Sequence, residues 1–508
     1  MAFDKNISFI LGQGGLGSPL PGYDYISGML FNSTTVPSGF TAGTAKALYS
    51  INDAISYGIV GDWSDETKAT AGLTVSTVVA GDTINIKVVE PYINSGTKTS
   101  TFGTYTITST DTTTTAASYI ASMINIGSTL YSASASTTKV TVSARPGLGA
   151  TINGTGLTVT ITGTSTTTQT TFTGGVSGLR APEYYQISEF FRLNPKGVLW
   201  VMYYTGSTDF TNINKMQIQS GNSIRQFGAF NSGATSSGQI TTDADNLQTQ
   251  GNTMFANYVP ASIIYAPNLY SVTDLSTLPN LRQRTDNYVS CVIGQDGAAA
   301  GAWMSIYTSA SCPSYGAVLG LLSASRVCED IAWVGSYNIT DNIELATPAI
   351  SNKSLYSTLY TTSYNLLNQL DGYGYIFNMT RPNIIGTWVN DSHVCIAKSS
   401  DYAYIERNRT IDKVVRYSYI ELSPLINSPV LLNSDGTLSA AALTIFEDAE
   451  KPLLDQMVQE KEISAYKIII NPNQNVQSTS TISVSIQIVG IGVARNITVT
   501  LGYVLAIK

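Results

Sequence analysis

Hydrophobic and polar positions follow two different periods between residues 72 and 175. Apolar residues alternate with polar ones in short runs around Ile86, Val140 and Val159, and a period of two predicts strands. A run around Ile120 has the helical spacing of three and four residues instead. We therefore expect a small β-rich domain with one helix here, inserted into the main fold and facing outward.

After Gly175 the pattern changes. Apolar runs at 198–204, 262–266 and 288–293 have no polar face, which is typical of strands buried on both sides of a sheet. Strands that alternate with helices predict an α/β layer arrangement. The helical patterns that separate the runs lie near 211–226, 242–257 and 314–327.

The two ends of the chain predict strands as well. Residues 5–11 have the pattern of a short strand, and a helix is expected over 42–59. Near the other end, alternating apolar residues at 482–488 and 497–501 predict a terminal hairpin. Helices are expected near 411–421 and 439–460, and Pro452 could divide the second one.

Composition narrows the class of protein. The chain has 508 residues, enough for about three domains, and is 43% hydrophobic, which predicts a globular fold. Only 12% of residues are charged, against about 25% in ordinary soluble proteins, so the surface suits packing against copies of the same chain. The net charge of -7 argues against nucleic acid as a partner. We expect no membrane span and no signal peptide.

A glycine-rich stretch near the N-terminus has the spacing of a nucleotide-binding motif. Gly12, Gly14 and Gly17 match the spacing of a dinucleotide-binding loop, but Pro19 and Pro21 prevent the helix that this loop needs. A flexible turn is the favoured interpretation.

His393 is the only histidine, with Asp391 and Cys395 nearby. A metal or Cys–His site is conceivable there, but a structural histidine at the start of a strand is favoured. The four cysteines have no paired spacing, so we expect buried free thiols. Loop carboxylates such as Asp296 suit turns, and the 30 tyrosines suit protein interfaces. We predict no catalytic residue, no metal site, no cofactor and no enzyme activity.

Several stretches resemble the tail sheath family of contractile phage tails, in a branch long known only as a domain of unknown function. They are residues 187–197 (ISEFFRLNPKG), residues 400–416 (SDYAYIERNRTIDKVVR) and the region from Leu443 to Tyr503. The inserted segment is similar to a β-rich module of phage structural proteins.

This resemblance implies an α/β sheath core with an inserted β-rich domain and a C-terminal α+β domain that ends in a β-hairpin. The expected divisions are an N-terminal arm (1–20), the first part of the core (21–71), the inserted Thr-rich domain (72–175), the α/β sheath domain (176–360), the C-terminal domain (361–494) and a C-terminal arm strand (495–508).

The resemblance also implies a structural function in a virion tail, assembled in the cytoplasm of a bacterial host. Subunits would stack as hexameric rings around a tail tube and contract to drive the tube through the host envelope during genome ejection. The implied partners are other copies of the chain, the tail tube protein, and the baseplate and tail terminator proteins. Arms of one subunit would complete the sheets of its neighbours by β-strand addition.

Particular residues carry these expected roles. The inter-subunit arms would use Ile7, Phe9, Leu11, Ile497, Val499, Leu501 and Val504. A C-terminal helix would face the tube with Glu447, Asp448, Glu450, Asp455 and Glu460, although a solvated acidic face explains these residues equally well.

Other functions stay open. The sheath of a capsid-less contractile injection system would have nearly the same sequence. An adhesin that grips host glycans through the Thr-rich domain is less favoured, and a cell-wall hydrolase with loop carboxylates is disfavoured by the single histidine.

Overall fold

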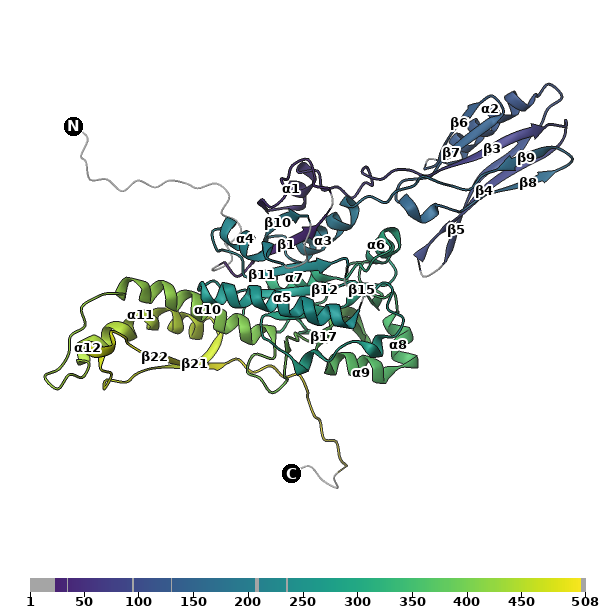
Figure 1. The fold of residues 1–508 in the computed structure, drawn as a ribbon. Helices are drawn as coiled ribbons and strands as arrows, with labels where there is room; N and C mark the ends of the chain where they lie inside the picture. Colours follow the sequence, from purple (N-terminus) through teal and green to yellow (C-terminus); the bar gives the residue numbers. More distant parts are fainter. Residues whose placement is uncertain are drawn as a thin grey trace, which may run out of the picture.

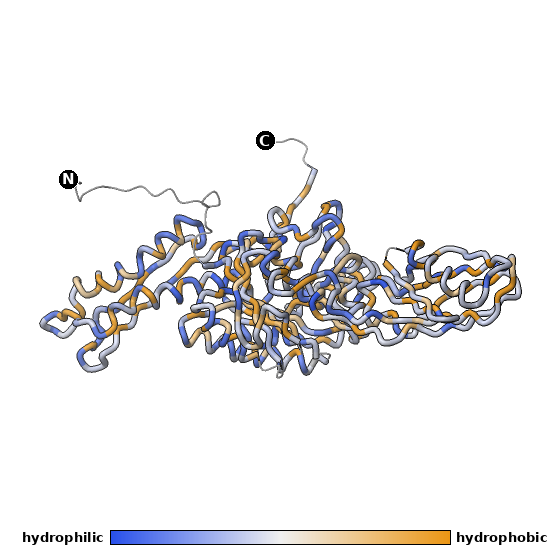
Figure 2. The backbone as a smooth tube through the Cα atoms, turned by 90° about the horizontal axis from the view of Figure 1, so that it is seen from above, coloured by the Kyte–Doolittle hydropathy of each residue, from blue (hydrophilic) through white to orange (hydrophobic). Residues whose placement is uncertain are grey.

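The computed structural model describes residues 23–503, except 34, 94–95, 129, 206–209 and 234–235. The described chain is elongated, with a central α/β part, a β-rich part at one end and a helix-and-strand part at the other (Figure 1). The same order along the long axis is visible after a 90° turn (Figure 2). The predicted strand at 5–11 and the turn at Gly12–Gly17 lie outside the described residues.

A seven-stranded sheet forms the centre, in the order β17-β14-β12-β11-β1-β10-β2. Neighbouring strands are parallel except for β2, which pairs antiparallel with β10 at the edge. The predicted α/β layer arrangement is confirmed. The strands are β1 (Ile26–Asn32), β2 (Ala45–Leu48), β10 (Val198–Tyr204), β11 (Gln226–Asn231), β12 (Ser262–Pro267), β14 (Val289–Val292) and β17 (Tyr375–Ile376).

Each face of this sheet has its own hydrophobic core. Met29 and Phe31 of β1 point into one core, with helices α3 (Arg180–Leu193) and α7 (Tyr315–Ala324). Leu30 points into the other, with helices α4 (Asn212–Gln219) and α5 (Ser237–Ala256). Because both faces are covered, these strands need apolar side chains on both sides.

Smaller elements complete the central part. The helices are α6 (Ala300–Thr308), α8 (Tyr356–Thr362) and α9 (Tyr364–Gly372). The remaining strands form pairs: β13 (Thr285–Asp286) with β20 (Cys395–Ile396), β15 (Gly294–Asp296) with β16 (Pro348–Ile350), and β18 (Asn378–Arg381) with β19 (Ile384–Val389).

Residues 70–169 form a separate unit, which we call the β module. Its two sheets have the orders β6-β7-β3-β9 and β5-β4-β8, and helix α2 (Thr113–Gly127) packs with them. Ile86, Ile120 and Val140 are completely buried in its core, as the alternation in the sequence predicts. Its strands are β3 (Thr70–Thr77), β4 (Thr83–Pro91), β5 (Thr97–Thr106), β6 (Ser132–Ser136), β7 (Lys139–Ser143), β8 (Leu157–Thr162) and β9 (Thr166–Gln169).

The β module is joined to the centre by its two chain crossings and by contacts with α6. The chain enters and leaves it through antiparallel bridges between Thr67 and Val176 and between Thr70 and Thr173. Helix α6 holds the module from the core side: the Trp303 indole donates to the carbonyl of Gly147 at 2.9 Å. The predicted domain boundaries stay a prediction.

The C-terminal part consists of α10 (Ile405–Leu422), α11 (Ala440–Gln459), β21 (Ile463–Ile470), the short α12 (Val476–Thr479) and β22 (Val484–Gly490). The predicted terminal hairpin is wrong in its pairing. β22 pairs antiparallel with β21, and residues 491–503 form neither helix nor strand. The pairing with β21 places Ile486 and Ile488 over α11, which gives their apolar side chains a core that residues 497–501 do not offer.

Two helix predictions also need correction. Over 42–59 the chain first adds β2 to the edge of the central sheet, and α1 (Ile51–Ser56) starts only afterwards. At the start of α1, the Asp53 carboxylate accepts a hydrogen bond from the backbone N–H of Ser50. Over 211–226 the helix ends at Gln219, and Gln226 begins β11. Pro452 lies inside α11 without dividing it.

Candidate functional site at a buried charged helix

Helix α10 carries five charged residues that are almost completely buried. Glu406, Arg409, Asp412, Lys413 and Arg416 are only 3–7% exposed. A buried charge is tolerated only when it is paired and hydrogen-bonded. The partners come from both ends of the described chain, and we call the whole set the charged junction.

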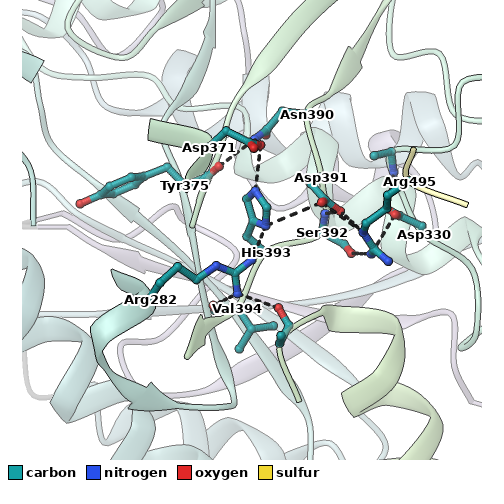
Figure 3. Close-up of polar contacts among 12 residues, drawn as sticks. Arg282, Asp330, Asp371, Tyr375, Asn390, Asp391, Ser392, His393, Val394 and Arg495 are labelled. Atoms are coloured by element: carbon teal, nitrogen blue, oxygen red, sulfur yellow. Dashed lines mark hydrogen bonds and ion pairs between the residues drawn. The ribbon is translucent and has the colours of Figure 1, made fainter. Parts of the chain in front are cut away.

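The C-terminal side of the charged junction is built around Arg495 (Figure 3). Its guanidinium contacts Asp330 at 2.9 Å, Asp391 at 2.9 Å and Glu406 at 2.7 Å. The same group lies 3.5 Å from the ring centre of Tyr404. One side chain therefore ties the segment after β22 to three separate parts of the fold.

Burial and the neighbouring charges shift the pKa values of both Asp330 and Arg495. Burial, together with the neighbouring Glu406 and Asp391, raises the pKa of Asp330 to about 7. Burial disfavours the charged form of Arg495, but Glu406 and Asp391 outweigh it and raise its pKa. Arg495 is therefore the cation that allows the surrounding carboxylates to stay buried together.

The N-terminal side of the charged junction is built around Asp24, two residues before β1. Its carboxylate lies 3.4 Å from the Lys413 amine and 3.3 Å from the Arg416 guanidinium. Lys413 also contacts Glu462, just before β21, at 2.7 Å. Burial opposes ionisation of Asp24, but Arg416 and Lys413 outweigh it and lower the pKa. Helix α10 thus contacts segments near both ends of the described chain.

Two further residues of α10 connect the charged junction to the central core. Arg409 donates to the carbonyl of Leu322 and to the hydroxyl of Ser325, both at 2.8 Å, at the end of α7. Asp412 lies beside Arg416 and Arg409, and its Oδ2 has no hydrogen-bond partner. Burial outweighs the nearby cations and raises the pKa of Asp412 to about 7.

His393 belongs to a neighbouring hydrogen-bonded loop (Figure 3). The Arg282 guanidinium donates to its Nδ1 at 2.5 Å, so its Nε2 carries the hydrogen that is donated to Asp371 at 2.9 Å. Within the described residues, no group of three or more His, Cys, Asp or Glu side chains is placed to hold a metal ion. All four cysteines are buried free thiols, as the sequence predicts, and burial raises the pKa of Cys395 to about 12.

The residues predicted for the C-terminal arm lie at the surface. Ile497, Val499 and Leu501 are 81%, 71% and 89% exposed, in a segment that pairs with no strand of the described chain. Ile7, Phe9, Leu11 and Val504 lie outside the described residues.

The five predicted tube-facing carboxylates do not share one face of α11. Glu447 and Asp448 are exposed. The other three interact inside the C-terminal part: Glu450 accepts a hydrogen bond from Ser418 at 2.7 Å, Asp455 from Tyr466 at 2.6 Å, and Glu460 from Gln456 at 2.8 Å. Glu450 is only 1% exposed and Asp455 and Glu460 are half-buried, so the fully exposed carboxylates are Glu447 and Asp448.

Sequence reasoning did not identify Arg495 or Asp24. A signal was present in α10, where charges at 406, 409, 413 and 416 recur at three- and four-residue steps and so follow one side of the helix. That spacing suggests a charged face, but it does not say whether the face is buried or which distant residues it meets.

The fold and the charged junction define a mixed α/β protein with several cores and a C-terminal part tied to the centre by buried ion pairs. Residues 401–508 match the family model described as DUF2586, C-terminal domain. This match begins just before α10 and includes Arg495, and it confirms the resemblance to a family branch known as a domain of unknown function.

Other comparisons are more distant. No curated protein matches the chain. A chain of the anti-feeding prophage (AFP) baseplate is similar at 11% identity, over 66% of this chain and 85% of that chain, with a TM-score of 0.43. A chain of an extracellular contractile injection system, the PVC sheath complex in the contracted state, is similar at 14% identity, over 64% and 81%, with a TM-score of 0.41. No helix among the described residues has the length and apolar character needed to cross a membrane.

Proposed function

We propose that this chain is a structural subunit of a contractile tail sheath and not an enzyme. Copies stack as hexameric rings around a tail tube and contract to drive the tube through a host envelope. The observation that carries this proposal is the segment around Ile497–Leu501, whose apolar side chains alternate and are exposed. Such a segment forms no strand within the described chain, and a second copy of the chain can supply the sheet edge on which it would become one.

The β21–β22 pair is the proposed acceptor. The sheet has only these two strands in the described chain, so each strand has an outer edge with unpaired backbone groups. Two-stranded sheets are marginal alone, and open edges bind further strands. Its inner face already covers α11 with Tyr466, Ile468 and Ile486. A strand from a neighbouring copy would extend this apolar layer.

Further contacts complete the proposed assembly. An N-terminal arm with Ile7, Phe9 and Leu11 makes a second connection between copies, and Glu447 and Asp448 face the tail tube protein. A head-to-tail contact that does not close generates a helical array. Contraction then changes side-chain interfaces while backbone links hold. Baseplate and tail terminator proteins contact the two ends of the sheath. The sheath is part of a virion tail that is assembled in the host cytoplasm.

The sheath of a capsid-less contractile injection system is the second candidate. The same exposed segment and open sheet edge serve both assemblies. The presence or absence of capsid proteins in purified particles distinguishes them.

Self-assembly of the purified chain tests the proposal. We expect long tubes or ring stacks in negative-stain electron microscopy, and folded monomers after deletion of residues 1–11 or 496–508. A small closed oligomer of the full chain would contradict the sheath, and normal polymerisation of both truncated chains would contradict strand exchange.

A further inference from the structure

Arg495 stands at a sharp boundary in the C-terminal segment. It is paired with buried carboxylates, whereas Ile497, two residues later, is 81% exposed. Five residues earlier, Gly490 ends β22. The segment is therefore fixed at one point and unpartnered immediately beyond it.

We propose that Arg495 is a positioning residue that fixes where the C-terminal strand leaves its own subunit, so that only residues beyond it are exchanged between copies. The inference rests on the sheath function proposed above. It adds the location of the root of the strand and the groups that hold it.

The geometry of the guanidinium supports a fixed root. Its Nε donates to Asp391, and its Nη2 donates to Glu406 and to the hydroxyl of Ser392. Its face lies over Tyr404. A guanidinium group that is hydrogen-bonded along its edge and stacked on its face has one orientation. The backbone at Arg495 therefore has a defined position and direction.

The carboxylates make release of Arg495 unfavourable. The side chains of Asp330, Asp391 and Glu406 are 7%, 15% and 4% exposed. Without the guanidinium they would remain close together and largely desolvated, which is strongly destabilising. Tension on the exchanged strand during contraction would therefore act on the α10 framework and leave Arg495 in place.

A fixed root also favours assembly. A strand that starts from a defined point samples fewer positions before it meets the edge of a neighbouring sheet, so less ordering is needed on binding. Loss of the root should weaken assembly even in chains that are fully folded.

The first experiment compares full-length variants at a temperature where near-UV circular dichroism shows all of them folded. We expect Arg495→Gln to raise the critical concentration for assembly about tenfold or more, and Arg495→Lys to raise it less. Arg407→Gln is the matched control, because Arg407 is exposed and lies 5.1 Å from the same Tyr404 ring. An unchanged critical concentration for folded Arg495→Gln would overturn the positioning role.

The second experiment uses two truncated chains that differ by one residue. Below the critical concentration of the full chain, a chain ending at Arg495 should keep the thermal midpoint of the full chain, whereas a chain ending at Ala494 should melt several degrees lower. Above that concentration, the chain ending at Arg495 should remain monomeric. Equal midpoints would overturn the anchor. Assembly of the chain ending at Arg495 would instead contradict the proposed strand exchange. These truncated chains and Arg495→Lys also decide the question if Arg495→Gln does not fold.

Discussion

The β module and the charged junction rely on buried charge to different extents. The module has a core of mostly apolar side chains, and its buried ion pair is that of Glu90 with Arg145. Helix α10 instead buries five charges and meets Asp24, Glu462 and Arg495. An apolar core tolerates many partners of suitable shape, but a buried ion pair demands a particular one. The difference indicates that the module is the adaptable part and the charged junction the specific one.

The largest expected effect is at the charged junction. Lys413→Met should lower the free energy of unfolding of the central part by about 3–5 kcal/mol, because Asp24 and Glu462 keep their buried charges without this cation. Urea unfolding followed by tryptophan fluorescence measures it. Lys451→Met, at an exposed position of α11, should change stability by less than about 0.5 kcal/mol. Equal effects of the two substitutions would show that the buried charges of α10 contribute no more to stability than exposed ones.

A cavity in the β module should act locally. Ile86 is completely buried, so Ile86→Ala should destabilise the module by about 3 kcal/mol. We expect hydrogen exchange to accelerate in β3–β9 and to stay unchanged in α10 and the central sheet. Thr101→Ala, at an exposed position of β5, is the control. Equal acceleration in α10 would show that the two regions unfold as one unit.

The two regions should also differ in their response to pH. Asp330 and Asp412 have a pKa of about 7 in the folded chain and a usual value of 3.8. The folded state therefore binds protons more tightly, and stability should rise by about 1 kcal/mol for each group as pH falls from 8.5 to 6. In the module, Ser165 lowers the pKa of Asp82 and Tyr105 lowers that of Asp111, so these two groups should contribute no change in that range.

Thermal midpoints measured across this pH range test the prediction. Asp412→Asn should make the central transition less dependent on pH, and the module transition should stay level. A central midpoint that falls on acidification from 8.5 to 6 would contradict the assignment.

The smallest expected effect lies where the β module joins the central part. The Tyr307 hydroxyl donates to Glu66 at 3.0 Å and accepts from the backbone of Gly178 at 2.6 Å. Tyr307→Phe should weaken the attachment of the module by about 1 kcal/mol, seen as a wider gap between two calorimetric transitions. Tyr92→Phe, at a half-exposed ring near Trp303, should leave the gap unchanged. A gap that does not widen for Tyr307→Phe would show that these hydrogen bonds are dispensable.

Local periodicity predicted much of the fold. Ile86, Val140 and Ile120 lie in the expected strands and helix because one face of each element is buried against its neighbours. Pairing was harder to predict: the alternation at 482–488 identifies a strand, but the same pattern is compatible with 497–501 or with β21. The structure favours β21, where the side chains reach the core over α11.

The charged junction was largely hidden from sequence reasoning. Arg495 is one basic residue in a Gly- and Ile-rich segment, and Asp330, Asp391 and Glu406 lie far from it in the sequence. Ion pairs across such separations depend on the packing of whole elements, and a single sequence carries no signal of that packing. The alternation at 497–501 was visible because it is a local property, but the hairpin expected from it was wrong, because pairing depends on tertiary structure.

The bridges at the base of the β module bring the two ends of the inserted segment together. Thr67 and Val176 face each other across an antiparallel pair, whose Cα atoms are about 5 Å apart. Replacing everything between them leaves the ends of the chain already adjacent, so any domain with neighbouring termini can be grafted there without stretching the scaffold. The position is thus suited to the insertion of a chosen domain in the laboratory.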